Sequence, residues 1–256
     1  MSPSLIALLT LVALVAGIVD AIAGGGGMLT VPALLAAGLP TKIALGTNKG
    51  VSTWGTAAAT LTFLRAGRLD SRRATLGFAG GAVGASLGAQ LQLAFSSEAL
   101  KPIVLVLLVI VAVVLAVHRP RPRPTAMEGA ERAKDLRVAA IAFAIALIIG
   151  AYDGFFGPGT GTFVIVAHVS ILSATLGEAT ADAKAVNLGS NVASLITFAI
   201  RGTVMWRVAL PMAAGNVIGG IIGARLAVKG GDRIIRLMVI AVSLALVAKL
   251  ANDVIR

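Results

Sequence analysis

The stretch GIVDAIAGGGGMLTVP, from Gly17 to Pro32, decides the fold, because it interrupts an apolar segment with an aspartate and four consecutive glycines. The apolar segment begins near Leu5 and is long enough to cross a membrane as a helix of about 20 residues. Four glycines end a helix and let another group approach the backbone closely. Inside a bilayer, non-helical backbone is tolerated only where it lines a cavity or is buried in protein. The stretch therefore predicts a helix that breaks at membrane depth.

The composition indicates a membrane protein. Hydrophobic residues make up 57% of the 256 residues and charged residues 13%, whereas a soluble domain is about 45–50% apolar and about 25% charged. The mean hydropathy is +0.95. We expect an all-α, polytopic integral membrane protein with the lipid bilayer as a partner. The first four residues, MSPS, contain no Lys or Arg, so we expect the first apolar segment to be retained and not cleaved as a signal peptide.

The net charge of +11 is concentrated in short loops between apolar segments. The two main loops are RAGRLDSRR, residues 65–73, and HRPRPRPTAMEGAERAKDLR, residues 118–137. Basic loops of this kind are typical of the cytoplasmic side of a bacterial inner-membrane protein, and we expect no nucleic-acid partner. The chain has no cysteine, which excludes disulfides and thiolate metal sites. We expect no metal and no cofactor.

The two halves of the chain repeat each other. GIVDAIAGGGG matches GAYDGFFGPGT, residues 150–160, and further along TFLRAG, residues 62–67, matches TFAIRG, residues 197–202. The repeat predicts a first transmembrane repeat at 1–117, a cytoplasmic linker at 118–137 and a second repeat at 138–256. The matched residues are Gly17 with Gly150, Asp20 with Asp153, Gly24 with Gly157, Gly26 with Gly159, Lys49 with Lys184, and Gly80, Gly84 and Gly88 with Gly215, Gly219 and Gly223.

Each repeat is expected to contain four main transmembrane helices and one short half-helix after the glycine break. The half-helices at 28–38 and 162–175 are too short to span the hydrocarbon core. Parallel and inverted arrangements of the repeats both remain open, and precedent among secondary transporters favours the inverted one. The main helices are predicted at 5–22, 43–64, 73–95 and 100–117 in the first half and at 137–152, 183–200, 207–227 and 233–250 in the second.

The glycine breaks and the matched lysines predict an anion site. The N-terminus of the half-helix after each break carries a partial positive charge, which suits an anion. The alternatives are that the glycines serve only close packing and that the lysines reach the membrane surface. The predicted substrate-binding residues are Gly24, Gly25, Gly26, Gly27, Asn48, Lys49, Gly157, Pro158, Gly159, Thr160, Gly161, Lys184, Asn187 and Asn191.

Other polar residues in the apolar segments have several interpretations. Asp20 and Asp153 could carry a coupling proton, pair with the lysines or hold the loops by accepting their N–H groups. The glycine ladders spaced by four residues predict close helix packing. His168 lies in an apolar half-helix without metal-ligating neighbours, so we expect a packed or interfacial histidine.

The sequence resembles the sulfite exporter TauE/SafE family of membrane permeases. The resemblance rests on DAIAGGGGMLTVP and GTNKG in the first half and on DGFFGPGTGTF and ADAKAVNLGSN in the second. It implies an inner-membrane permease that moves a small anion such as sulfite, a sulfonate or a related carboxylate, with coupling to an ion gradient.

The expected function is therefore secondary transport of a small anion, and we do not expect an enzyme. A passive anion channel is the first alternative. An intramembrane enzyme is the second, and it lacks a nucleophile with a base or a metal cluster. The substrate, the direction of transport, the coupling ion and any homo-oligomer remain open.

Overall fold

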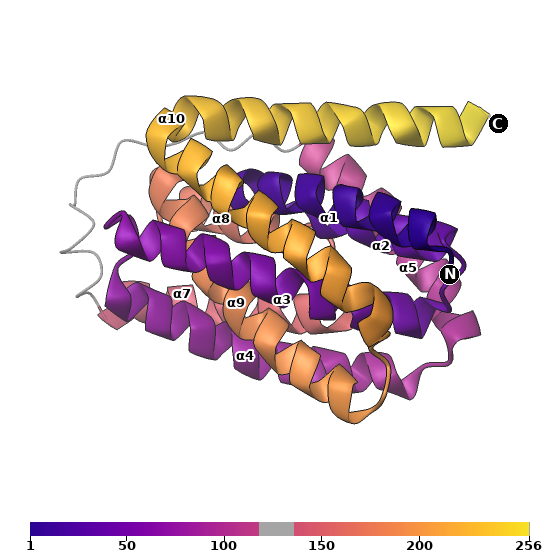
Figure 1. The fold of residues 1–256 in the computed structure, drawn as a ribbon. Helices are drawn as coiled ribbons and strands as arrows, with labels where there is room; N and C mark the ends of the chain where they lie inside the picture. The colour runs from indigo at the N-terminus through magenta and orange to yellow at the C-terminus, as the bar shows by residue number, and fades with distance from the viewer. Residues whose placement is uncertain (118–135, 256) are drawn as a thin grey trace.

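The computed structural model describes residues 1–117 and 136–255, and within them the chain forms helices and turns with no strand (Figure 1). The predicted all-α membrane class is confirmed. Within the described residues, three helices are long and apolar enough to cross a membrane on their own, at Pro3–Ala23, Leu136–Phe155 and Trp206–Gly231. The helices are α1 (Pro3–Ala23), α2 (Gly27–Ala36), α3 (Thr41–Arg65), α4 (Ser71–Ala94), α5 (Ser97–Val117), α7 (Leu136–Phe155), α8 (Thr160–Ile171), α9 (Leu176–Ile200) and α10 (Trp206–Ile255).

Two predicted boundaries are wrong, and both have local causes. α8 ends at Ile171 and α9 begins at Leu176, so the predicted segments 162–175 and 183–200 each miss this junction. Thr175 and Glu178 form a capping box, in which each side chain accepts a hydrogen bond from the other residue's backbone N–H. The sequence prediction overlooked this signal. The predicted linker lies outside the described residues except for its last two positions, which begin α7.

α10 is two helical legs joined at a reversal. Gly231 has φ 54° and ψ −155°, a conformation outside the helical region. Figure 1 shows the second leg turning back beside the bundle, so that the N- and C-termini lie at the same end. The predicted pair of helices at 207–227 and 233–250 thus corresponds to these two legs.

The two halves are inverted relative to each other. α3 and α9 are equivalent helices of the repeat, and they pack together along the centre of the bundle. Thr53 Oγ1 donates to the Asn191 backbone oxygen, whereas Thr60 Oγ1, two turns later, donates to the Lys184 oxygen, two turns earlier. Equivalent helices therefore run antiparallel, which is the inverted arrangement.

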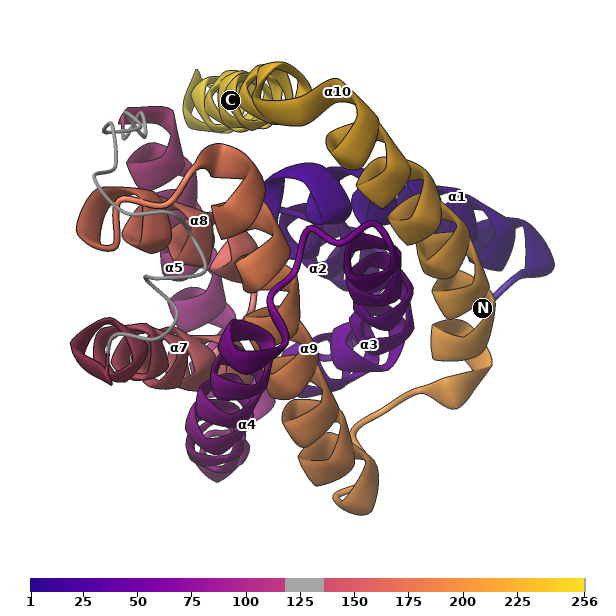
Figure 2. The same ribbon diagram turned by 90° about the vertical axis from the view of Figure 1, so that its left-hand side faces the viewer.

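The fourth helix of each half packs against helices of the other half. α4 packs against α7 and α9, and the first leg of α10 packs against α1 and α3, as Figure 2 shows in a view along the bundle. The glycine ladders lie at these contacts. A Cβ on Gly84 would lie 2.0 Å from the Leu147 backbone oxygen, and one on Gly219 would lie 2.0 Å from the Leu14 oxygen. Close packing by the ladders is confirmed.

The bundle has two ends, which we name the N-terminal end and the linker end. The N-terminal end contains the starts of α1, α3 and α10, and the linker end contains the starts of α4, α7 and α9. An apolar cluster at the N-terminal end includes Phe198 and Val204. Another at the linker end includes Phe63 and Leu176. Phe63 and Phe198 are equivalent residues of the repeat, so the two clusters contain the same aromatic side chain at matching positions.

Candidate anion site

The two glycine breaks meet at the centre of the bundle. Gly24 and Gly157 follow the ends of α1 and α7 with φ angles of 78° and 98°, which favour glycine strongly. A Cβ on Gly24 would lie 2.3 Å from the carbonyl carbon of Gly161. A Cβ on Gly27 would lie 3.2 Å from the Cα of Pro158. Glycine is thus required both by the backbone conformation and by the contact between the breaks.

Lys49 forms an ion pair with Asp153 beside the second break. Its Nζ lies 2.7 Å from Asp153 Oδ2 and donates to Asn191 Oδ1 at 3.0 Å. The lysine is only 2% exposed. Asp153 also accepts hydrogen bonds from Thr160 Oγ1, at 2.7 Å, and from Ser190 Oγ. A buried charge needs such a partner, so Asp153 anchors Lys49 in the interior.

Lys184 forms the reciprocal pair with Asp20 beside the first break. Its Nζ lies 3.1 Å from Asp20 Oδ2 and also donates to the Asp20 backbone oxygen, which accepts the N–H of Gly24 as well. Lys184 is fully buried. Each lysine therefore pairs with the aspartate of the opposite half, and neither reaches the membrane surface.

The two aspartates differ in exposure. The Asp20 side chain is 19% exposed, whereas the Asp153 side chain is 5% exposed. Asp20 and Asp153 both line a central cavity, together with Lys49. The inverted symmetry is therefore approximate at the site, and the Asp20 carboxylate is the more accessible of the two.

The central cavity is small and polar. Its free volume is about 20 Å³, which is about the room that one water molecule needs. Among the described residues, the buried Oδ1 of Asn187 has no hydrogen-bond partner. The space admits a molecule of about the size of water. Its lining is Asp20, Gly24, Gly27, Asn48, Lys49, Ser52, Asp153, Gly157, Thr160, Asn187 and Asn191.

Six predicted site residues lie next to the cavity without lining it. Lys184 lies behind Asp20, and Gly161 packs between Gly24 and the Asn187 side chain. Gly26 packs on the Ala16 oxygen. The remaining three belong to the breaks themselves: Gly25, whose oxygen accepts the N–H of Met28; Pro158, whose oxygen accepts from Tyr152 Oη; and Gly159, the N-cap of α8.

Sequence reasoning missed two residues that hold the site. Thr30 donates to Asn48 Oδ1, and the Tyr152 hydroxyl donates to the Pro158 oxygen at 2.5 Å. Thr30 is the only hydroxyl residue in an otherwise apolar half-helix, which was its signal. Tyr152 is the single tyrosine of the chain and precedes Asp153 directly.

A wider basic pocket opens at the N-terminal end. It has a volume of about 450 Å³ and contains Lys42 and Arg201. Lys42 lies two helical turns before Lys49 on the same face of α3. Arg201 follows Phe198 at the end of α9. The remaining lining residues are Gln90, Leu93, Ala94 and Thr203.

Comparisons with known proteins place this geometry in context. The model of the sulfite exporter TauE/SafE family matches residues 9–250. A probable membrane transporter protein of Sinorhizobium is 37% identical over 254 residues, which cover 97% of this chain and 93% of the relative. Probable membrane transporter proteins of Haemophilus influenzae and Escherichia coli K12 are 34% and 36% identical, over 97% and 98% of this chain and 95% and 91% of their own lengths. No solved structure matches the chain.

Proposed function

The chain belongs to the sulfite exporter TauE/SafE family of membrane transporters, and from this premise we propose that it is a secondary transporter of a small anion. The family's description names sulfite, and an organosulfonate or a related sulfur or carboxylate compound is an anion of similar size and charge. The site would be the central cavity between the breaks, in a multi-pass protein of the bacterial inner membrane. Its bacterial relatives are named probable membrane transporters, which supports this location.

The observation that carries the proposal is the reciprocal pairing of Lys49 with Asp153 and of Lys184 with Asp20. Ionisable side chains inside a membrane protein are costly and usually mark a transport pathway. Each ammonium group holds a carboxylate beside a glycine break, so the site already binds two anionic groups of its own. A substrate anion would replace a carboxylate as the partner of a lysine.

This exchange gives a mechanism for coupling. An anion can take the place of the Asp20 or Asp153 carboxylate more easily when that carboxylate is protonated, because protonation removes the competing negative charge. Proton binding and anion binding would then favour each other. Asp20 is the better candidate for the exchange because its side chain is the more exposed of the two.

The distribution of basic residues supports a cytoplasmic linker end. The positive-inside rule places loops rich in Lys and Arg in the cytoplasm. The N-terminal end carries Lys42, Lys101, Arg201 and Arg207. The linker end carries more: Arg65, Arg68, Arg72, Arg73, Arg137, Arg225 and Lys229.

The same orientation suggests how the site would alternate. Phe198 and its apolar cluster would separate the central cavity from the basic pocket on the outer side, and Phe63 would do so on the cytoplasmic side. The cavity has no room for a substrate anion in this closed state. Rocking of the inverted halves would open one cluster at a time, as expected for inverted-repeat transporters.

A binding screen tests the proposal directly. Purified protein would be heated with sulfite, sulfate, thiosulfate, sulfonates or small carboxylates, because a ligand of the folded state raises its apparent stability. We expect one of these classes to stabilise the parent protein and the Lys42→Gln control, but not Lys49→Gln. Equal stabilisation of Lys49→Gln would remove the central lysine from the site.

A passive anion channel on the same scaffold is the alternative. The inverted repeats with paired breaks favour a transporter, because this arrangement is typical of secondary transporters. Counterflow of labelled anion in proteoliposomes separates the two functions. Flux without counterflow that a proton ionophore does not alter would support the channel.

A further inference from the structure

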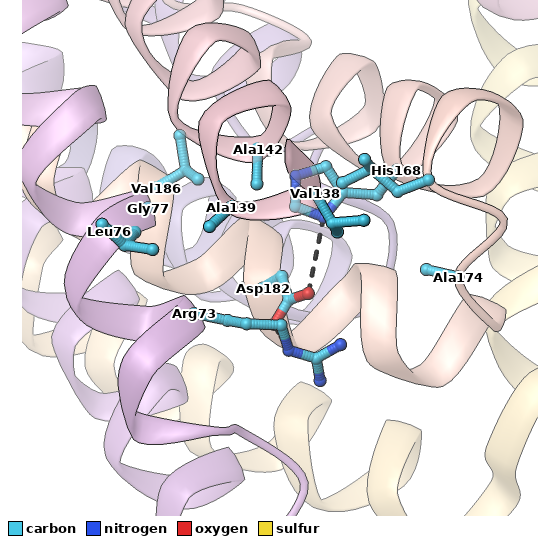
Figure 3. Close-up of a pocket in the computed structure, with 11 residues that line it drawn as sticks. Arg73, Leu76, Gly77, Val138, Ala139, Ala142, His168, Ala174, Asp182 and Val186 are labelled. Carbon is cyan, nitrogen blue, oxygen red and sulfur yellow. Dashed lines mark ion pairs between the residues drawn. The ribbon is translucent and has the colours of Figure 1, made fainter. Parts of the chain in front are cut away.

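A second group of ionisable side chains lies beside another cavity, whose lining shares no residue with that of the central cavity. Figure 3 shows this group in close-up. Asp182 of α9 lies between His168 of α8 and Arg73 of α4. The His168 Nδ1 is 3.5 Å from Asp182 Oδ2, and the Arg73 Nε is 3.7 Å from Asp182 Oδ1. His168 and Asp182 are each only 4% exposed. The sequence prediction of a packed histidine is correct, but its neighbours are charged.

The group has unmet hydrogen-bonding capacity. Among the described residues, both ring nitrogens of His168, the Oδ1 of Asp182 and the Nε of Arg73 are buried without a hydrogen-bond partner. Buried polar atoms rarely remain unpaired, and polar contacts slightly too long for a direct bond are often bridged by water. The adjoining cavity, lined by these three residues, has a free volume of about 20 Å³, which suits one water molecule.

The repeat does not require this group. The positions equivalent to His168, Asp182 and Arg73 at the N-terminal end are Leu35, Thr47 and Val208. All three are uncharged residues on the equivalent helices α2, α3 and α10. The charged group is therefore an addition to one end of a symmetric scaffold, and its cost in burial calls for a role.

We propose that His168, Asp182 and Arg73 form a proton-binding site, in which a water molecule completes the hydrogen bonds and the imidazole takes up the proton. Imidazole is the side chain that changes charge near neutral pH. A protonated His168 would hold the Asp182 carboxylate from one side while Arg73 holds it from the other. The site is distinct from the proposed coupling residues Asp20 and Asp153.

The surroundings of the imidazole agree with this role. From α9 it faces Asp182, and Glu178 lies one turn earlier, 4.0 Å from Arg73 Nη1. From α4 it faces Arg73. α7 contributes only apolar side chains to the cavity, Val138, Ala139 and Ala142, and has Arg137 at its start. Asp182 is thus the acidic group that faces the histidine directly.

Protonation of this site would stabilise the closed linker end. The group joins α4 of the first half to α8 and α9 of the second half at this end of the bundle. α8 also begins at Thr160, which donates to Asp153 at the central site. This consequence rests on the proposed function: a proton taken up from the cytoplasmic side would keep that side closed.

Histidine NMR tests the proton site without any transport assay. The chain has two histidines, so His118→Gln leaves His168 as the source of a single side-chain signal. We expect that signal to change when the buffer is acidified. In Asp182→Asn the response to acid should differ, because the carboxylate that faces the imidazole is lost, and in Asp182→Glu it should return towards the parent. A signal that does not respond to acid, or a response that is unaffected in Asp182→Asn, overturns the proposal.

Transport measurements test the consequence. With the linker end facing a buffer of varied pH, acid should reduce anion flux in the parent several-fold and much less in His168→Gln, which is uncharged throughout. If no anion is transported by the parent, the proposed function fails while the NMR result still decides the proton site. If the parent transports but His168→Gln keeps its full acid inhibition, the site does not control closure.

Discussion

Lys49 of the first half lies 2.7 Å from Asp153 of the second, and this pair is repeated in reverse by Lys184 and Asp20. The crossing of the pairs follows from the inverted arrangement, because it brings the α3 and α9 lysines beside the breaks of the opposite half. The pairs hold the two halves together in the closed state. They also place the lysine charges, which an anion site needs, beside the two breaks. These breaks are the non-helical stretches between α1 and α2 and between α7 and α8.

Removing one member of a pair should cost both stability and binding. Lys49→Ala leaves Asp153 buried without its cation, which typically costs about 3–5 kcal/mol. The double variant Lys49→Ala/Asp153→Ala should recover most of that stability, because no charge is left unpaired. Neither variant should bind the anion. Thermal unfolding and ligand-dependent shifts in detergent would measure both effects, and anion binding by the stable double variant would contradict the role of Lys49.

The carboxylates should transmit a proton gradient to the anion. In proteoliposomes, an imposed pH gradient should change the rate of anion uptake by the parent, and Asp20→Asn should lose most of this response. Asp153→Asn should lose it as well, with a larger loss of stability, because the Asp153 carboxylate has three polar partners, Lys49, Thr160 and Ser190. A retained response in both variants would make the aspartates structural.

The glycine ladders should tolerate no side chain. Gly84→Ala places a Cβ 2.0 Å from the Leu147 backbone oxygen, so α4 and α7 must move apart. Gly50→Ala is a milder helical control, because the nearest atoms to its Cβ belong to the side chains of Val204, at 3.0 Å, and Ala209, at 3.1 Å, and not to a backbone. We expect the ladder variant to lower the melting temperature markedly more than the control. Similar melting temperatures would show that the helices separate easily.

Much of this architecture was predictable from the sequence because it depends on local signals. Apolar length predicted the helices, and the paired breaks predicted where helix continuity is lost. Repeat spacing also identified the two lysines as equivalent. It could not show that Lys49 contacts Asp153 and not Asp20, because that choice depends on how the halves are inverted and exchange α4 and α10. The His168 site was missed for the same reason: its three members come from separate helices and have no counterpart in the repeat.

The orientation and the alternation can be tested with single cysteines, because the chain contains none. Ser71→Cys is at the exposed start of α4, at the linker end, and Ser4→Cys is exposed at the N-terminal end. A membrane-impermeant thiol reagent should label Ser4→Cys from outside whole cells and Ser71→Cys only after the cytoplasmic side is opened, as the positive-inside rule requires.

Ser52→Cys lines the central cavity and should be labelled slowly from either side, with a rate that substrate changes. Replacing Phe198 by Ala should speed labelling of Ser52→Cys from outside, and Phe63→Ala should do so from the cytoplasmic side. Rapid labelling of Ser52→Cys from both sides, without a change at Phe198 or Phe63, would indicate an open pore and contradict alternating closure.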